Sequence, residues 1–282
     1  MKIGHHIDKN YVKSENISDQ IIMAKKLVKQ ETDITINTIG IFVFGPKSYK
    51  VTVHPDDYDN IKKLHMNIFV HNAYVCNPWG TKLKQALHFI RKQLEICEHI
   101  NATGFILHLP KNNIEMVIQV LKLLYNPNLM TKIYLEIPAI KYTHSIFEKA
   151  EVLNELFNII QKEIDPKLDY FGLCIDTAHL WSSGLDISSY NNVQAWLNTL
   201  KIDHKNIFFH LNDNLKKLGQ APDTHEVLME GEIWKKYKNN LHHSGLYAFL
   251  EYIMKHNIPF IFERKKYPDV LSDYFIINKL FK

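Results

Sequence analysis

Acidic and histidine side chains follow six short apolar runs in this chain, at the point where each run ends. The six runs end in His71, His108, Glu136, Asp176 (with His179 three residues later), His210 and Glu263. Short apolar runs of this kind are typical of parallel strands that are buried on both faces. A polar residue at the end of every such strand indicates convergence on one face of a barrel. Histidine and carboxylate donors without cysteine suit borderline metals such as zinc or manganese.

Taken singly, most of these residues have a plainer interpretation. A histidine at the end of a buried strand, such as His71 or His108, is more often a hydrogen-bonded core residue. Glu136 differs, because a buried carboxylate is costly unless it is paired or bound to a metal. Asp223 and His225 form an Asp-x-His pair in a long loop, where such side chains are usually solvated. Together the nine residues are enough to supply three or four ligands to each of two or three metals.

Length and composition restrict the class of protein. The 282 residues, 46% of them apolar, suit one large domain spanning 1–282. No run reaches the roughly 18 apolar residues of a membrane span, and the first residues do not resemble a signal peptide, so we expect an intracellular protein that is not secreted. Three cysteines form neither a metal pair nor an even disulfide set. The net charge of +4 permits a polyanionic partner without requiring one.

Strand and helix patterns alternate along the chain. Strand candidates start near Lys2, Thr38, Asn67, Gly104, Lys132, Tyr170, Asn206 and Pro259. Helical periodicity covers 83–97, 193–200 and 246–255, and residues 145–148 resemble a capping box that opens a further helix. This alternation predicts a single-domain (β/α)8 TIM barrel. A doubly wound sheet is the alternative, but no glycine-rich nucleotide turn supports it. The long connection over 212–235 is expected to be functional.

Several other residues keep two interpretations. Tyr74, three residues after His71, is either a partly buried loop aromatic or an exposed ring that enters a nucleic-acid duplex. His5 and His6 either support the site or lie in a solvated turn. His242 and His243 are expected at the surface.

Four short segments carry a resemblance to a known family. They read CIDTAH at 174–179, HLND at 210–213, DTH at 223–225 followed by EGEI at 230–233, and HNAY at 71–74. On these segments the chain resembles the endonuclease IV family of apurinic/apyrimidinic (AP) endonucleases, which are trinuclear zinc TIM barrels. The resemblance extends over essentially the whole chain.

The resemblance implies three zinc ions per chain, with manganese as an alternative at one site. The implied ligands are His71, His108 and Glu136 for the first metal; Glu136, Asp176, His210 and Glu263 for the second; and His179, Asp223 and His225 for the third. Glu136 and Glu263 are the implied catalytic residues, and Glu263 would orient or deprotonate the nucleophile. Tyr74, Lys47 and Tyr49 are expected to contact DNA, although residues 45–49 are less basic than the corresponding family segment.

The implied activity is metal-dependent hydrolysis of the phosphodiester 5′ to an abasic site in duplex DNA. It would leave a 3′ hydroxyl and a 5′ deoxyribose phosphate, and blocked 3′ ends would also be trimmed. The protein is expected to act as a monomer. No lysine stands among the strand-end residues, which favours hydrolysis over a Schiff-base lyase.

Two alternatives remain open. A sugar isomerase or epimerase on the same type of barrel would need only Glu136, Asp176, His210 and Glu263, and the other five candidate ligands would have no role. A non-catalytic lesion-binding protein with structural metals would keep every ligand and lack turnover.

Overall fold

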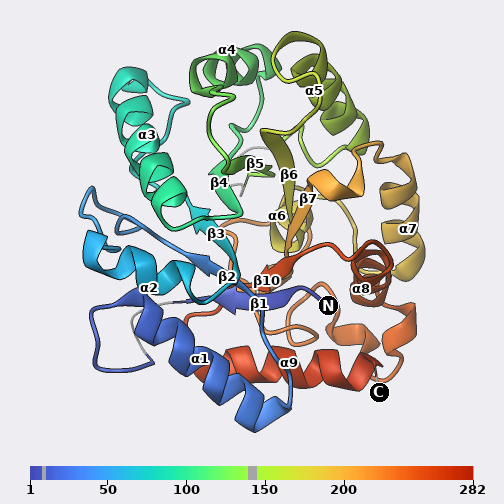
Figure 1. Ribbon diagram of the computed structural model, residues 1–282. Helices are drawn as coiled ribbons and strands as arrows, with labels where there is room; N and C mark the ends of the chain where they lie inside the picture. The colour runs from blue at the N-terminus through green and yellow to red at the C-terminus, as the bar shows by residue number, and fades with distance from the viewer. Residues whose placement is uncertain (8–10, 139–144, 282) are drawn as a thin grey trace.

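Eight parallel strands close into a barrel in the computed structural model, which describes residues 1–7, 11–138 and 145–281 (Figure 1). The strands are β1 (Ile3–His6), β2 (Thr38–Ile41), β3 (Asn67–His71), β4 (Gly104–His108), β5 (Lys132–Glu136), β6 (Phe171–Asp176), β7 (Ile207–His210) and β10 (Phe260–Phe262). The barrel closes where β1 pairs with both β2 and β10. The predicted TIM barrel is confirmed, and each strand begins within one residue of its predicted start.

Helices surround the barrel and connect its strands (Figure 1). They are α1 (Ile17–Thr32), α2 (Tyr58–Lys62), α3 (Leu83–His99), α4 (Ile114–Leu124), α5 (Ala150–Glu163), α6 (Thr177–Ser182), α7 (Tyr190–Thr199), α8 (Gly245–His256) and α9 (Tyr267–Phe281). Short 3-10 turns lie at η1 (Pro55–Asp57), η2 (His204–Asn206), η3 (Lys235–Tyr237) and η4 (Leu241–His243). Helices α1 and α9, from opposite ends of the chain, pack against each other. None of the helices in the described ranges is long and apolar enough to cross a bilayer.

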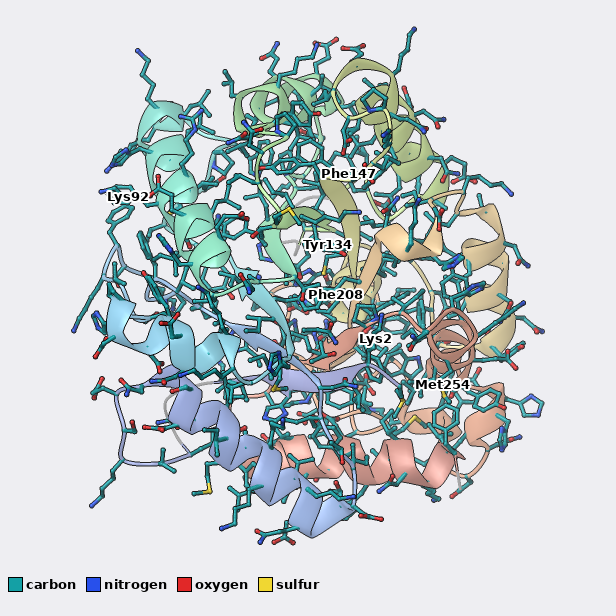
Figure 2. The ribbon with its side chains drawn as sticks, viewed as in Figure 1. Lys2, Lys92, Tyr134, Phe147, Phe208 and Met254 are labelled. Atoms are coloured by element: carbon teal, nitrogen blue, oxygen red, sulfur yellow. The ribbon has the colours of Figure 1, made fainter. Side chains whose placement is uncertain are left out.

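A layer of apolar side chains fills the barrel interior. It consists of Phe69, Ile106, Tyr134, Cys174, Phe208 and Ile261, which form one buried cluster. Figure 2 places Tyr134 and Phe208 in the middle of the ring of strands. The rings of Phe69 and Phe208 stack with centroids 3.7 Å apart. Glycine at 104 and 172 leaves room for Tyr134, because a Cβ at either position would lie 2.7–2.8 Å from its ring.

Each residue of this layer stands two positions before a candidate ligand. Phe69 precedes His71, Tyr134 precedes Glu136, and the same spacing holds on the other four strands. Side chains two apart on a strand point to the same face. The apolar layer therefore lies directly beneath the strand-end donors.

The predicted capping box is wrong. Helix α5 begins at Ala150, and its N-cap residue Lys149 makes no side-chain cap bond. The Ser145 hydroxyl accepts from the backbone N–H of Phe147, only two residues on, and so caps a local turn. Phe147 is fully buried in the segment that precedes the helix.

The long connection over 212–235 contains a two-stranded hairpin of β8 (Asp213–Asn214) and β9 (His225–Glu226). Its return is clamped by Asp213, whose Oδ1 accepts from the N–H groups of Asn214 and Ile233. Gly231 is required there, because a Cβ would collide with that same oxygen. The HLND and EGEI segments thus meet in space, and Asp213 is a structural clamp.

Four further histidines that the sequence singled out lie outside the cluster of candidate ligands. His5 is fully buried, and its two ring nitrogens pair with the hydroxyls of Tyr274 and Tyr11 at 2.9 and 2.7 Å. It therefore lies neither in a solvated turn nor against the candidate ligands. His6 packs on the ring of Phe42. His242 and His243 are exposed, as predicted.

Candidate metal centre

All nine predicted donors lie on the face of the barrel where its strands have their carboxyl ends. Five of them are the last residue of their strand: His71, His108, Glu136, Asp176 and His210. Glu263 directly follows β10, His179 lies in the first turn of α6, and the β8–β9 hairpin brings in Asp223 and His225. The loop pair, which alone would be interpreted as solvated, lies against the strand-end residues because the hairpin folds back over the barrel.

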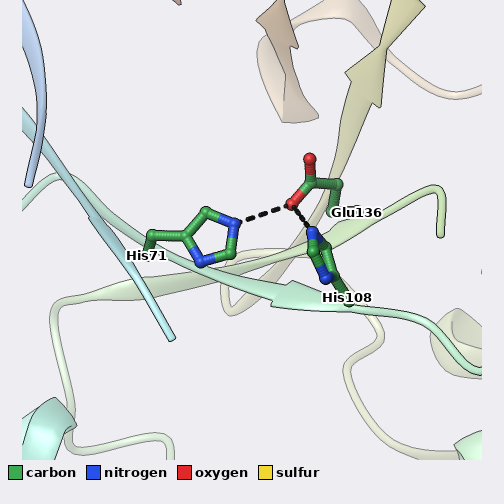
Figure 3. A group of neighbouring side chains, drawn as sticks. All are labelled: His71, His108 and Glu136. Carbon is green, nitrogen blue, oxygen red and sulfur yellow. Dashed lines mark hydrogen bonds and ion pairs between the residues drawn. The ribbon is translucent and has the colours of Figure 1, made fainter. Parts of the chain in front are cut away.

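Glu136 is the centre of the cluster and is fully buried. Its Oε2 lies 3.2 Å from Nε2 of His71 and 2.8 Å from Nε2 of His108, and both rings point at this one oxygen (Figure 3). Its Oε1 lies 2.8 Å from Nδ1 of His210. One carboxylate therefore faces two separate groups of histidines, which is the arrangement that a bridging ligand requires.

A second group lies on the other side of Glu136. Nδ1 of His210 is 3.7 Å from Oδ2 of Asp176 and 3.4 Å from Oε2 of Glu263. One donor atom from each of these residues and from Glu136 lies within 4.8 Å of all the others. The second oxygen of Asp176 accepts from the backbone N–H of His179 and caps α6, which fixes this carboxylate.

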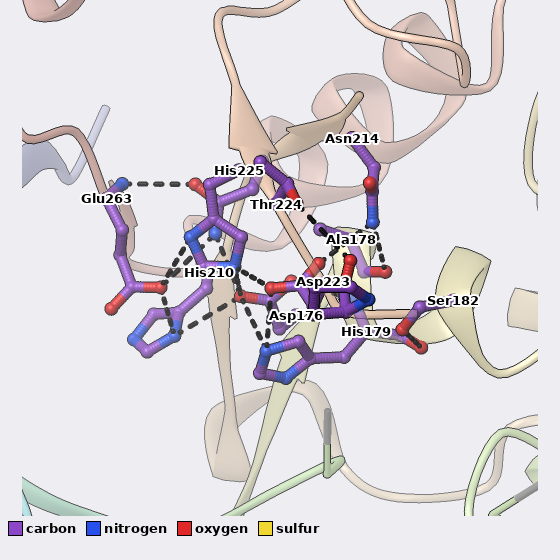
Figure 4. A network of polar contacts seen from close by, with 12 residues as sticks. Asp176, Ala178, His179, Ser182, His210, Asn214, Asp223, Thr224, His225 and Glu263 are labelled. Carbon is purple, nitrogen blue, oxygen red and sulfur yellow. Dashed lines mark hydrogen bonds and ion pairs between the residues drawn. The ribbon is translucent and has the colours of Figure 1, made fainter. Parts of the chain in front are cut away.

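The third group joins α6 to the hairpin (Figure 4). Oδ2 of Asp223 lies 3.6 Å from Nε2 of His179 and 2.7 Å from Nε2 of His225. Nε2 of His225 is also 3.6 Å from Oδ2 of Asp176. Glu136 thus contacts both the first and the second group, and Asp176 contacts both the second and the third, so the three groups form one continuous cluster.

The hydrogen bonds at Nδ1 of His71 and of His179 show which nitrogen of each ring is free to bind a metal ion. Nδ1 of His71 pairs with the Asn72 carbonyl at 3.0 Å, and Nδ1 of His179 pairs with the Ile137 carbonyl at 2.8 Å. A carbonyl accepts only, so each Nδ1 carries the proton and, in the neutral ring, each Nε2 presents a lone pair. Those lone pairs face carboxylate oxygens, an arrangement that a cation between them stabilises.

Spacing agrees with this interpretation. Tetrahedral zinc with bonds of 2.0–2.1 Å places its ligand atoms roughly 3.3 Å apart. The separations of 3.2 Å (His71 to Glu136), 3.4 Å (His210 to Glu263) and 3.6 Å (His179 to Asp223) lie close to that value. The separations of 2.8 Å from His108 and from His210 to Glu136, and of 2.7 Å from His225 to Asp223, are those of direct hydrogen bonds. The donor set and the wider separations fit zinc.

Charges within the cluster compensate one another. Burial opposes ionisation of Glu136, but His108 and His210 outweigh it and hold the pKa of its carboxyl well below the usual range. Burial likewise opposes ionisation of Glu263, and His210 and His225 still lower its pKa to about 2. For Asp176 burial prevails and raises the pKa, although His179 and His225 act against it. A positive charge placed among these carboxylates is therefore stabilised.

A cavity of about 620 Å³ opens over the cluster. Its floor includes His71, His108, His179 and Glu263, and its walls include Trp79, Pro110, Pro138 and Pro222. The indole N–H of Trp79 donates to the carbonyl of His108 at 2.7 Å, which fixes the ring beside the first group. Sequence reasoning missed Trp79 and also Lys111, which lines the cavity three residues after His108. The sequence offers one indication for both residues: each follows a strand-end histidine by fewer than ten positions.

The residues expected to contact DNA lie on one side of the cavity. Tyr74 lines it, is 49% exposed, and holds its ring nearly parallel to that of His108 with centroids 6.0 Å apart. Its backbone N–H donates to the carbonyl of Pro46, so the loop bearing Lys47 and Tyr49 borders it. Lys47 is exposed, and Tyr49 stacks on Phe89 with centroids 4.2 Å apart. Neither is part of the cavity lining, and their contact with DNA remains a prediction.

Comparison with known proteins identifies the family. The family model described as "Xylose isomerase-like TIM barrel" matches residues 40–268. A protein of African swine fever virus (isolate Pig/Kenya/KEN-50/1950) named "Probable AP endonuclease" is 35% identical over 244 residues, which are 83% of this chain and 81% of that protein. The chain belongs to the endonuclease IV family of AP endonucleases. A second member of this family, "Probable endonuclease 4" of Halothermothrix orenii, is 24% identical over 90% of the chain and 94% of its own length.

Solved structures agree. The crystal structure of AsfvAP:AG matches with a TM-score of 0.91 and 30% identity, covering 100% of this chain and 99% of the other. Endonuclease IV from Thermus thermophilus matches with a TM-score of 0.74 and 18% identity, covering 100% and 99%. A D-tagatose 3-epimerase-like protein shares the fold at a TM-score of 0.65 and 19% identity, covering 100% and 97%. The barrel is therefore common to endonucleases and sugar epimerases, and only the site can separate them.

Proposed function

We propose that this protein is a zinc-dependent DNA-repair endonuclease that hydrolyses the phosphodiester 5′ to an abasic site in duplex DNA. The products are a 3′ hydroxyl and a 5′ deoxyribose phosphate, and blocked 3′ ends are removed by the same chemistry. The observation that carries the proposal is the convergence of nine donors in three groups at one cavity. Six of the nine line the cavity, and Glu136, Asp176 and His210 are fully buried beside them. The names of the relatives, AP endonuclease and endonuclease 4, support the same activity.

Three zinc ions are proposed, held by the three groups, with Glu136 shared between the first and second. When bound, they would supply Lewis acidity that makes a water acidic near neutral pH and stabilises the negative charge on the phosphate and its leaving oxygen. His71 and His108 hold the first ion. Asp176, His210 and Glu263 hold the second, and His179, Asp223 and His225 hold the third.

Glu263 is the proposed catalytic carboxylate. The side chains of Glu136 and Asp176 are fully buried, whereas that of Glu263 is 16% exposed and lines the cavity. The ionised carboxylate can accept a hydrogen bond from an attacking water and so orient it. Glu136 contributes by holding the first two groups at a fixed separation.

The cavity suits a nucleotide that has lost its base. Its walls of Trp79 and four prolines offer apolar surface to a deoxyribose, while the phosphate faces the donors that line the cavity. Extruding a nucleotide from the duplex costs least where the base is already missing. Tyr74, exposed at the rim, is placed to fill the gap left in the duplex.

The surplus of donors favours this function over a sugar isomerase or epimerase. Such an enzyme needs only the second group, and His71, His108, His179, Asp223 and His225 would then be buried or half-buried polar residues without a role. A lesion-binding protein would have the same donors and the same cavity as the proposed endonuclease, and would differ from it only in not cleaving the DNA. We further propose that the protein acts as a monomer, inside the cell, wherever the DNA to be repaired is found.

A nicking assay tests the proposal directly. A 5′-labelled duplex carrying one tetrahydrofuran abasic analogue is incubated with zinc-loaded protein, and an undamaged duplex of the same sequence is the control. We expect one product, cut immediately 5′ to the analogue and extendable by a polymerase, together with close to three zinc ions per chain by elemental analysis. Full zinc loading without cleavage would favour the lesion-binding protein, and one metal or fewer would favour the isomerase.

A further inference from the structure

Asn212 lies directly behind the metal centre without belonging to any group of donors. It follows β7 two residues after His210 and is fully buried. Its side-chain N–H₂ donates to Oδ2 of Asp176 at 2.8 Å and to Oε2 of Glu263 at 3.3 Å. One amide group thus contacts two of the three carboxylates of the second group.

The orientation of this amide is fixed by its other side. The side-chain oxygen of Asn212 accepts from the backbone N–H of Glu263 at 3.1 Å and from Nη1 of Arg264 at 2.7 Å. A guanidinium can only donate, so the oxygen must face Arg264 and the N–H₂ must face the carboxylates. Every hydrogen-bonding position of the amide is used, and no rotation is available to it.

Arg264 is itself held by a carboxylate of the last helix. Its Nε lies 2.7 Å from Oδ2 of Asp273, which stands in α9, and both side chains are buried. The other oxygen of Asp273 accepts from the backbone N–H of Leu228 at 2.8 Å, in the connection that carries the hairpin. A continuous chain of contacts therefore runs from α9 through Arg264 and Asn212 to Asp176 and Glu263.

We propose that Asn212, held by Arg264 and Asp273, is a positioning residue that fixes the Asp176 and Glu263 carboxylates for metal binding and ties the metal centre to helix α9. The inference rests on the proposed metal ligation at this site and adds residues that do not themselves bind metal. Each carboxylate keeps a lone pair toward the second group while a hydrogen bond from Asn212 limits its rotation.

The size of the effect follows from the role of such supporting residues. Removing a hydrogen bond that orients a metal ligand commonly weakens metal binding about 10–100-fold. Without Asn212, Asp176 keeps its bond from the His179 N–H. Glu263 loses the hydrogen bond from the amide at Oε2 and keeps there only the contacts with Nδ1 of His210 and of His225, each at 3.4 Å. We therefore expect the weakening at the second group in particular.

The test compares two variants with a matched control. Asn212→Ala removes the amide. The double variant Arg264→Met with Asp273→Asn removes the support from α9 without leaving a buried charge unpaired, and keeps an acceptor for the Leu228 N–H. The control is Asn206→Ala. Asn206 is also a buried asparagine that accepts from a cation, Lys132 at 2.6 Å, but it precedes β7 at the opposite end of that strand.

Zinc affinity is measured by competition with a chromophoric chelator on folded protein, and the rise in melting temperature on adding zinc is recorded in parallel. We expect one zinc ion to bind about 10–100-fold more weakly in Asn212→Ala and in the double variant. The thermal gain from zinc should shrink in both, and nicking lost at low zinc should return in part when zinc is raised. Asn206→Ala should lower the melting temperature while leaving zinc affinity as in the wild type.

The outcomes separate this inference from the proposed function. Wild-type zinc affinity in both variants, or an equal loss in Asn206→Ala, overturns the positioning role and leaves the proposed endonuclease intact. A wild-type protein that binds zinc but does not nick abasic DNA overturns the proposed function while the variants still decide the positioning role. A wild-type protein that binds no zinc overturns both.

Discussion

The phenyl ring of Phe208 packs edge-on against the imidazole of His210, with ring centroids 5.3 Å apart and planes at 81°. The two residues stand two positions apart on β7, the first in the apolar layer and the second among the donors. The same boundary occurs on five other strands. The barrel core therefore ends where the proposed metal centre begins, and the core does not depend on the ligands.

This separation predicts that the protein stays folded when its metals are removed. After chelation the far-ultraviolet circular dichroism spectrum should keep its native shape, and unfolding should remain cooperative. Zinc added back should raise the melting temperature in a concentration-dependent way, because it binds only the folded state. Loss of secondary structure at 25 °C on chelation would contradict this prediction and would make the metals part of the folding core.

Glu263→Gln should keep the fold and most duplex binding but lose most cleavage. The amide has nearly the same shape but carries no charge, so it can neither accept a proton from water nor neutralise a metal. Single-turnover nicking of an abasic duplex gives the rate, and a gel-shift assay gives the binding. Glu163→Gln on the outer helix α5 is the matched control and should nick as the wild type does. A Glu263→Gln rate within a few-fold of the wild type would remove this residue from the mechanism.

Tyr74→Ala should weaken binding to an abasic duplex by roughly 1–3 kcal/mol if the ring stacks in the gap. Tyr74→Phe retains the ring and should bind within about two-fold of the wild type, which separates stacking from the hydroxyl. Both affinities can be read by fluorescence anisotropy, with undamaged duplex for comparison. Equal affinity of all three proteins for abasic DNA would make Tyr74 a packing residue over His71 and His108.

The sequence predicted the barrel and the strand-end donors because both follow from short-range rules, whereas the loop residues Asp223 and His225 were assigned by the family resemblance. A strand alternates its faces, so a residue two positions after an apolar interior position points inward at the open end of the barrel. Trp79 and Asn212 escaped prediction because their roles depend on partners distant in the chain, the His108 carbonyl and the Arg264–Asp273 pair. Ser145 was misinterpreted because its hydroxyl accepts from the backbone N–H two residues later, whereas a capping box needs the N–H three residues later, and the sequence pattern alone does not distinguish the two.

His5 predicts a loss of stability at mildly acidic pH. Burial, with a smaller repulsion from His6, lowers the pKa of His5 to about 3, against an ordinary value of 6.5. Below pH 6.5 His5 is protonated in the unfolded chain but stays neutral in the folded protein. The free energy of unfolding is therefore highest above pH 6.5 and decreases as the pH falls toward 3. Between pH 6.5 and 5 the loss is about 2 kcal/mol.

The comparison is between wild-type protein and His5→Gln, which cannot be protonated. Urea unfolding in chelator at pH 7 and pH 5 gives the free energy of unfolding of each. The other histidines contribute to both proteins alike, so the wild type should lose about 2 kcal/mol more than the variant between these two values. Parallel losses would show that His5 is protonated within the folded barrel.

The last prediction concerns the type of cut. A lyase needs an amine to form a Schiff base with the abasic sugar and would cut on the 3′ side. Lys111 lines the cavity, so an amine does lie near the site even though no strand ends in lysine. We still expect hydrolysis, because six of the nine donors line the cavity whereas Lys111 follows β4 in the loop beside Pro110.

Lys111→Arg decides between the two chemistries, since it keeps the positive charge but cannot form a Schiff base. The variant should nick within a few-fold of the wild type and leave a 3′ hydroxyl that a polymerase extends. Borohydride should trap no protein–DNA adduct with either protein, and complete chelation should abolish cutting by both. A trapped adduct that disappears in Lys111→Arg, or cutting that survives metal removal, would assign the activity to the amine and leave the donors a structural role.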